Sequence, residues 1–96
     1  MISIGILKIH LQLPGCMSLK EKRSILKPLL ARLHRQFNIS AAEIDLQDHW
    51  QETIIACSLV SNGQGFTQKS LQAIPPWIEN NWPNLTLIDD QLELIH

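Results

Sequence analysis

Residues 18–38, SLKEKRSILKPLLARLHRQFN, have the spacing of a long amphipathic helix. Ser18 and Glu21 match a capping box, in which the Ser18 hydroxyl accepts from the Glu21 amide and the Glu21 side chain reaches back. Pro28 removes one hydrogen bond inside this pattern. Because the apolar stripe continues on both sides of it, we expect one bent helix that ends at a left-handed Asn38. The apolar positions, three and four residues apart, are Leu19, Leu26, Leu29, Leu30, Leu33 and Phe37.

Four segments around this helix have the apolar content of β-strands. In the first, the parity of the apolar residues changes between Ile6 and Leu7, which a β-bulge or a strand start buried on both faces would explain. A second helix is expected over residues 66–81, and Pro75 and Pro76 divide it so that its second half is a separate short turn or helix. The expected strands cover residues 2–13, 39–45, 50–61 and 85–95.

The resulting order, βαββαβ, is the split βαβ pattern of the ferredoxin-like fold. We therefore predict an α+β protein with a four-stranded antiparallel sheet and two helices on one face, as a single domain over residues 1–96. Right-handed crossovers place the first and third strands at the centre of the sheet. The third strand is apolar on both sides, which indicates a covered second face, as in a homodimer built through the open face of the sheet.

The chain lacks the apolar segments of a membrane or secreted protein. No apolar run approaches the length of a membrane-spanning helix, and the first residues lack the basic start and long apolar run of a signal peptide. We expect a cytoplasmic protein with no membrane partner. Cys16 and Cys57 are too few for a disulfide framework and are expected to be free thiols.

The charge of the chain is strongly polarised, although its net charge is only −1. Residues 18–35 hold six of the eight Lys and Arg residues and a single acid, which gives +5, whereas the remainder holds two cations and eight acids, which gives −6. Polarity of this kind concerns binding partners more than folding. The six cations are Lys20, Lys22, Arg23, Lys27, Arg32 and Arg35.

The predicted topology brings the start of the first helix next to the hairpin at residues 45–51, which joins the second and third strands. On a helical wheel Lys20, Arg23 and Lys27 form one exposed stripe with His34. The stripe and the hairpin together suggest a recognition site of charges, amides and one indole. Its candidate binding residues are Lys20, Lys22, Arg23, Lys27, Asp45, Gln47, Asp48, Trp50 and Gln51.

Lys22 differs from the other cations because it falls on the apolar side of the helix. A lysine in that position must snorkel to water or find a partner. We expect Asp45 and Asp48 to be its partners. The alternative to a recognition site is therefore a structural ion-pair cluster that ties the helix to the hairpin, worth about 0–1 kcal/mol for each exposed pair.

No arrangement of residues typical of catalysis is present, so we expect a protein that is not an enzyme and has no cofactor. Asp45, Asp48 and His49 resemble metal ligands only loosely, since no second histidine has a defined spacing, and no metal is expected. The loop after the first strand contains one cysteine and is not rich in glycine, unlike the loops of metal-transfer domains and acylphosphatases with this fold. The central strands also lack the aromatic residues of RNA-recognition domains.

Six short segments of the chain together carry a family resemblance. They are LPG at 13–15, SLKEKR at 18–23, FN at 37–38, AEIDLQDHWQ at 42–51, SN at 61–62 and LIDD at 87–90. Through these segments the chain closely resembles the YlxP-like family, a bacterial group of small proteins of unknown function with a ferredoxin-like fold. The resemblance implies, loosely, a role around translation or RNA, because genes of this family often lie near those of translation initiation and ribosome-binding factors. It implies no catalytic residues.

Two functions follow as hypotheses. The first is a non-enzymatic binding module whose basic helix meets RNA or a ribosome-associated protein, with Gln47, Trp50 and Gln51 adding contacts. The alternative is a dimeric regulatory domain that holds a small ligand between the start of the helix and the hairpin.

Overall fold

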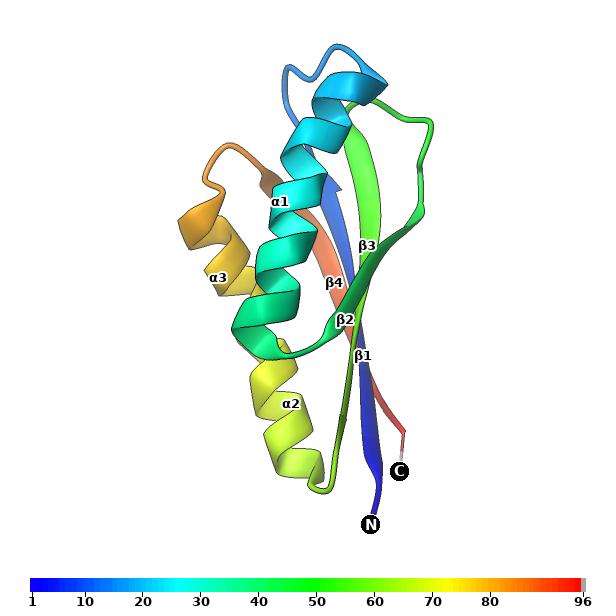
Figure 1. Ribbon diagram of the computed structural model, residues 1–96, viewed down its shortest axis with the longest axis vertical. Helices are drawn as coiled ribbons and strands as arrows, with labels where there is room; N and C mark the ends of the chain where they lie inside the picture. The colour runs from blue at the N-terminus through cyan, green and yellow to red at the C-terminus, as the bar shows by residue number, and fades with distance from the viewer. Residues whose placement is uncertain (96) are drawn as a thin grey trace.

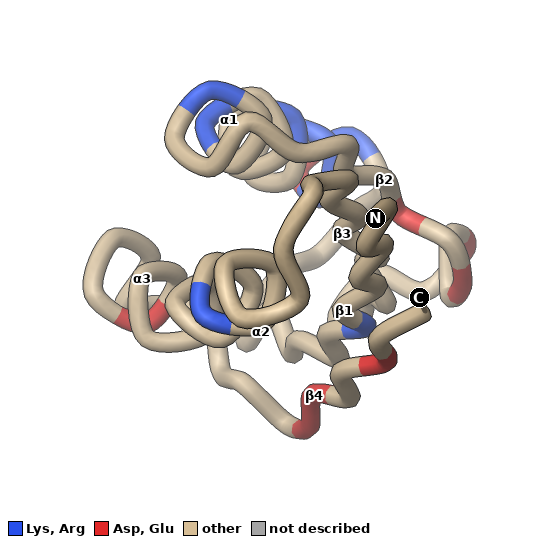
Figure 2. The backbone as a smooth tube through the Cα atoms, turned by 90° about the horizontal axis from the view of Figure 1, so that it is seen from below, with Lys and Arg blue, Asp and Glu red and all other residues tan. Residues whose placement is uncertain are grey.

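A computed structural model describes residues 1–95 of the chain. Its elements are β1 (Ser3–Gln12), α1 (Leu19–Phe37), β2 (Ser40–Asp45), β3 (Glu52–Ser61), α2 (Gln64–Gln72), α3 (Ile74–Asn81) and β4 (Thr86–Ile95). The strands form one antiparallel sheet in the order β2-β3-β1-β4, and the helices lie on one face of it (Figure 1 and Figure 2). The predicted α+β, ferredoxin-like fold is confirmed, with β1 and β3 at the centre. The expected second helix is two helices, α2 and α3, which meet just before Pro75 and Pro76.

Alternate side chains of the two central strands point at the helices and form the core. In β1 these are the odd-numbered residues, and the register between β1 and β3 is continuous along both strands. There is therefore no bulge between Ile6 and Leu7, and that alternative is wrong. Ile4 and Ile6 lie half-buried on the open face instead. The buried apolar residues of β1, α1 and β3 are Leu7, Ile9, Leu11, Leu26, Leu29, Leu33, Ile55, Cys57 and Leu59.

The ends of α1 follow the local sequence. Ser18 Oγ accepts from the amide of Glu21 at 3.0 Å, while Glu21 Oε2 accepts from the amide of Met17 at 3.1 Å, one residue before the expected position. The helix continues through Pro28, which is exposed, so that water can reach the carbonyl that loses its amide donor. Asn38 adopts the expected left-handed conformation, with φ 52°, and ends the helix.

Arg32 connects α1 to α3, so its guanidinium group is already engaged within the protein. Its guanidinium carbon lies 5.2 Å from the ring centroid of Trp77 and 4.9 Å from that of Trp82, which is cation–π geometry. Its Nη2 donates to Asn81 Oδ1 at 3.2 Å. Phe37 meets Trp77 edge to face at 5.4 Å, so the two helices share one aromatic cluster.

The uneven distribution of charge along the sequence produces oppositely charged regions on the surface. Lys and Arg residues gather on α1, whereas acids lie along β4 and around the β2–β3 connection (Figure 2). Asp89, Asp90 and Glu93 of β4 are all exposed. A negatively charged partner is therefore attracted to one side of the molecule and repelled by the other.

Candidate functional site

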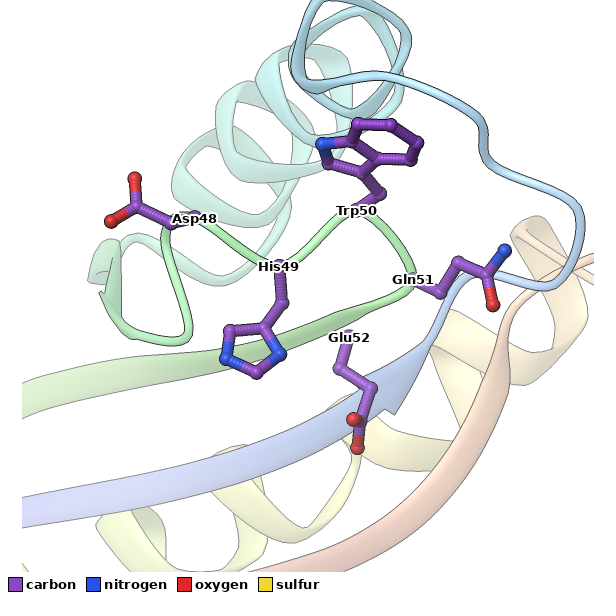
Figure 3. A pocket seen from close by; sticks show the side chains of 5 residues that line it. All are labelled: Asp48, His49, Trp50, Gln51 and Glu52. Atoms are coloured by element: carbon purple, nitrogen blue, oxygen red, sulfur yellow. The ribbon is translucent and has the colours of Figure 1, made fainter.

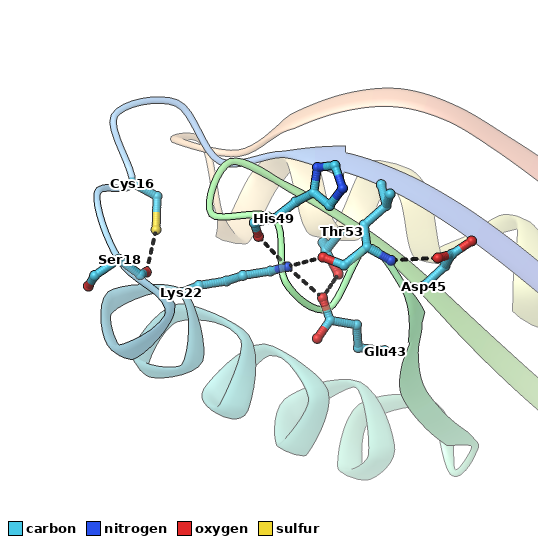
Figure 4. Close-up of polar contacts among 8 residues, drawn as sticks. Cys16, Ser18, Lys22, Glu43, Asp45, His49 and Thr53 are labelled. Atoms are coloured by element: carbon cyan, nitrogen blue, oxygen red, sulfur yellow. Dashed lines mark hydrogen bonds and ion pairs between the residues drawn. The ribbon is translucent and has the colours of Figure 1, made fainter.

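Lys22 is buried between α1 and the β2–β3 connection, and only 2% of it is exposed. Its Nζ donates to the carbonyls of Leu46 at 2.7 Å and His49 at 2.6 Å, and it lies 2.8 Å from Oε2 of Glu43 (Figure 4). The three N–H bonds of the ammonium group thus have three acceptors. The same Glu43 oxygen also accepts from Thr53 Oγ1 at 2.6 Å. Lys22 therefore ties the connection to the helix.

The inward direction of Lys22 agrees with the sequence, but the expected partners Asp45 and Asp48 are wrong. The pairing of β2 with β3 shifts between Glu43 and Asp45, which marks a β-bulge. Glu43 precedes the shift, lies opposite the buried Ile55 and faces the helices, whereas Asp45 follows the bulge and is exposed. Asp45 Oδ1 accepts from the amide of Leu46 at 2.7 Å and so stabilises the turn instead of the lysine.

Leu46 adopts a left-handed backbone conformation, with φ 60°, which costs a residue other than glycine about 1–2 kcal/mol. Its carbonyl accepts from Lys22 Nζ and also from the amide of His49 at 3.0 Å. The buried ammonium group therefore helps to hold a backbone conformation that the local sequence does not favour.

Lys20, Arg23 and Lys27 form an exposed row along α1, as the helical wheel predicts. Within residues 1–95 the ion pairs are Lys22–Glu43 and His10–Glu52, so none of these three cations is paired with a carboxylate. We call Lys20, Arg23 and Lys27 the cation row. Its charges are solvated and free to meet an anionic partner. His34, the fourth member of the predicted stripe, is also exposed, although its Nδ1 contacts the Ile39 carbonyl.

A groove of about 450 Å³ runs between α1 and the β2–β3 connection. Its volume falls within the range of about 300–1,000 Å³ that is typical of small-molecule sites. Leu19, Leu26 and Leu30 of α1 supply its apolar floor. The paired Lys22 and Glu43 also line it, as does Asp48 of the β2–β3 connection. The groove is lined by Leu19, Lys22, Arg23, Leu26, Lys27, Leu30, Glu43, Gln47 and Asp48. Five of the nine residues predicted from sequence therefore line one concave surface, and Lys20 lies beside it on the same helix.

The last part of the connection forms an open hollow of about 380 Å³ over Asp48–Glu52. Trp50 is 49% exposed and points toward the start of α1, whereas His49 points to the other side (Figure 3). Gln51 Nε2 donates to the carbonyl of Cys16 at 3.2 Å, and the Gln51 carbonyl accepts from the amide of Leu13 at 2.8 Å. Gln51 thus anchors the connection to the loop before α1, while the Trp50 ring remains available to a partner.

Few features of the described residues suggest reactive chemistry. In residues 1–95 no group of three or more His, Cys, Asp or Glu side chains is placed to hold a metal ion. Burial raises the pKa of the Cys57 thiol to about 12, so this cysteine is protonated at neutral pH. Cys16 is also buried, and its Sγ donates to the Ser18 carbonyl at 3.5 Å. No helix within residues 1–95 combines the length and the apolar character needed to cross a bilayer.

The sequence did not indicate Glu43 or the apolar floor of the groove. Glu43 precedes the expected partner Asp45 by two residues, and only the bulge between them separates their roles. Leu19, Leu26 and Leu30 belong to the apolar stripe of α1, and periodicity assigns all of them to the core. The signal available was the width of that stripe, since Leu19 and Leu30 remain half-buried at its edge.

Comparisons with known proteins agree with this architecture. A family model described as "Protein of unknown function (DUF503)" matches residues 4–91. The chain is 43% identical over 63 residues to "Uncharacterized protein YlxP" of Bacillus subtilis (strain 168), a match that covers 66% of this chain and 68% of that protein. Among solved structures, "De novo designed protein Foldit4" is similar with a TM-score of 0.57 and 10% identity, covering 100% of this chain and 98% of that one. A likeness at such low identity concerns the fold alone.

Proposed function

Since the chain belongs to the DUF503 family, which is described only as being of unknown function, we propose from its surface that it is a non-enzymatic module that binds RNA through α1. The observation that carries the proposal is the cation row, Lys20, Arg23 and Lys27. These cations are exposed and have no carboxylate partner within residues 1–95. Lys22, the fourth cation in this part of α1, is instead buried and paired with Glu43. Folding therefore does not account for the cation row, whereas binding to a polyanion does.

The spacing of the cation row suits a nucleic acid backbone. Lys20 and Lys27 are seven residues apart, which corresponds to about 10 Å along a helix axis. A row of this length can meet more than one phosphate of a single strand, so its binding should weaken as the salt concentration rises. Trp50 adds an exposed ring near the start of α1, and aromatic rings of this kind stack on bases that are not paired.

The test compares two pairs of charge-removing substitutions. The variant Lys20→Gln/Lys27→Gln is expected to bind single-stranded RNA more weakly and to reduce the slope of log K against log salt by about 1.4, because each lost phosphate contact removes about 0.7. The matched control is Lys8→Gln/Lys69→Gln, which removes two exposed cations outside α1. Equal weakening by both variants, or no binding by the wild type at about 50 mM salt, refutes the proposal.

A dimeric regulatory domain is the second candidate, and the open face of the sheet is the observation that favours it. Ile4 and Ile6 are half-buried there without a covering element, and the neighbouring Val60 and Ile95 are 66% and 47% exposed. Three strands of ten residues and one of six present a face of roughly 570 Å². Two such faces bury about 1,100 Å², which lies just above the ~1,000 Å² expected of a biological interface.

Light scattering on the wild type and on Val60→Lys tests this second candidate. A dimeric mass that Val60→Lys converts to a monomeric mass supports it, and ligand-induced shifts of melting temperature across a metabolite panel would then identify the ligand class. A monomeric mass at all protein concentrations rejects the dimer.

A further inference from the structure

The groove beside the cation row has three chemically distinct parts. Leu26 and Leu30 of α1 form an apolar floor, and Arg23 and Lys27 provide cations on the helical side. Across the groove, Gln47 and Asp48 are both exposed and contribute an amide and a carboxylate. An apolar floor with a few convergent polar groups is the general form of a small-molecule site.

Side chains of opposite charge line this groove without forming an ion pair among the described residues. Asp48 lines the same concave surface as Arg23 and Lys27, yet it forms an ion pair with neither of them among the described residues. Lys22, which also lines the groove, is already neutralised by Glu43. A ligand that fills this space therefore needs an anionic group on one side, a flat or apolar body in the middle, and hydrogen-bond donors on the other side.

A nucleotide unit has all three of these properties. Its phosphate is suited to Arg23 and Lys27, its base is flat, and the amino edge of the base donates hydrogen bonds. We propose, resting on the RNA binding proposed above, that the groove holds one unpaired guanine of a single-stranded RNA. The two oxygens of Asp48 accept from the adjacent N1–H and N2–H donors of guanine, a bidentate arrangement that adds specificity as well as affinity.

Single-stranded RNA is the required form because the Watson–Crick edge of guanine is occupied in a duplex. Unpaired bases of loops and ends can be splayed out and hydrogen-bonded along that edge. Trp50 points toward the start of α1, near the same end of the groove, and its exposed ring can stack on a neighbouring base (Figure 3). The cation row then contacts phosphates of the RNA backbone, while Asp48 recognises one base through hydrogen bonds.

The experiment measures the affinities of the wild type and of Asp48→Asn for three nine-nucleotide RNAs. These are oligouridine, the same strand with one central guanine, and the same strand with inosine, which lacks the 2-amino group.

We expect the wild type to prefer the guanine strand to oligouridine by about tenfold, because a good bidentate pair discriminates to this extent. The inosine strand is expected to lie between the two. Asp48→Asn is expected to lose most of this preference, because an amide offers one acceptor oxygen in place of two. The control Asp89→Asn removes an exposed acid on β4 and is expected to keep the preference.

The outcomes separate this proposal from the one on which it rests. If the wild type binds all three strands equally, or if Asp48→Asn and Asp89→Asn both keep the preference, the guanine site is refuted while RNA binding by α1 stands. If no strand binds at low salt, both proposals fail. Loss of the preference in Asp48→Asn alone supports the guanine site.

Discussion

Replacing Lys22 by methionine removes a buried ammonium group and keeps most of the apolar stem of the side chain. The Glu43 carboxylate, with its side chain 20% exposed, then keeps only Thr53 as a donor, and the carbonyl of His49 loses its lysine donor. Removing one partner of a buried pair costs about 3–5 kcal/mol, because the other charge is left uncompensated. Small domains are stable by about 5–15 kcal/mol, so this loss removes a large part of the stability.

Urea denaturation followed by circular dichroism measures this loss, and thermal unfolding checks it independently. For a domain of this size about 1 kcal/mol corresponds to about 4–8 °C, so Lys22→Met is expected to lower the melting temperature by roughly 12–40 °C. The exposed neighbour Lys20 provides the control, since Lys20→Met is expected to change the stability by less than about 0.5 kcal/mol.

The double variant Lys22→Met/Glu43→Leu tests the physical cause. It removes both charges at once, so it is expected to recover part of the lost stability, because no buried charge then lacks a partner. If Lys22→Met lowers the free energy of unfolding by less than about 1 kcal/mol, the pair contributes no more than an exposed salt bridge, and the reasoning is refuted.

Three further predictions concern packing and pH. Gly5→Ala is expected to destabilise the protein by about 1–3 kcal/mol in urea denaturation, because a Cβ at this position would lie 2.5 Å from side-chain atoms of both Leu71 and Thr67. Gly65→Ala, in the first turn of α2 with nothing within 4 Å of the added Cβ, should instead stabilise by about 0.4–1 kcal/mol, and a loss would contradict the helical assignment. The folded-state pKa of Cys57 is about 12 and lies above its ordinary value of 9.0, so the unfolded chain loses this proton first and stability should fall as the pH rises above 9, by up to about 1.4 kcal/mol per unit. Cys57→Ala should flatten this alkaline decline, and an unchanged decline would assign it to other groups.

Local rules were sufficient for most of the secondary structure. The start of α1 at Ser18 and its end at Asn38 follow from capping chemistry that involves only neighbouring residues. The strand positions follow from apolar alternation, and the order of the elements then leaves few topologies open. The helix also continues across Pro28, as the apolar stripe on both sides of this residue predicts.

The candidate site depended more on tertiary structure. The sequence placed the cation row on one helical face and turned Lys22 inward, because helical periodicity is a local property. It could not identify Glu43 as the partner of Lys22, since a bulge in β2 decides which side chains of that strand face the helix. The groove is likewise a product of two elements far apart in the chain, α1 and the β2–β3 connection.

The amino-acid sequence by itself thus determined the elements, their order and the polarised charge, because each depends on neighbouring residues or on simple counts. Only the tertiary structure decided which groups satisfy the buried Lys22, because its acceptors come from β2 and the β2–β3 connection. Lys22 lies in the same turn as Arg23, yet one is buried among three acceptors and the other remains in solvent. The physical reason is that a buried charge must be matched by partners brought from elsewhere in the fold, whereas an exposed charge is satisfied by water.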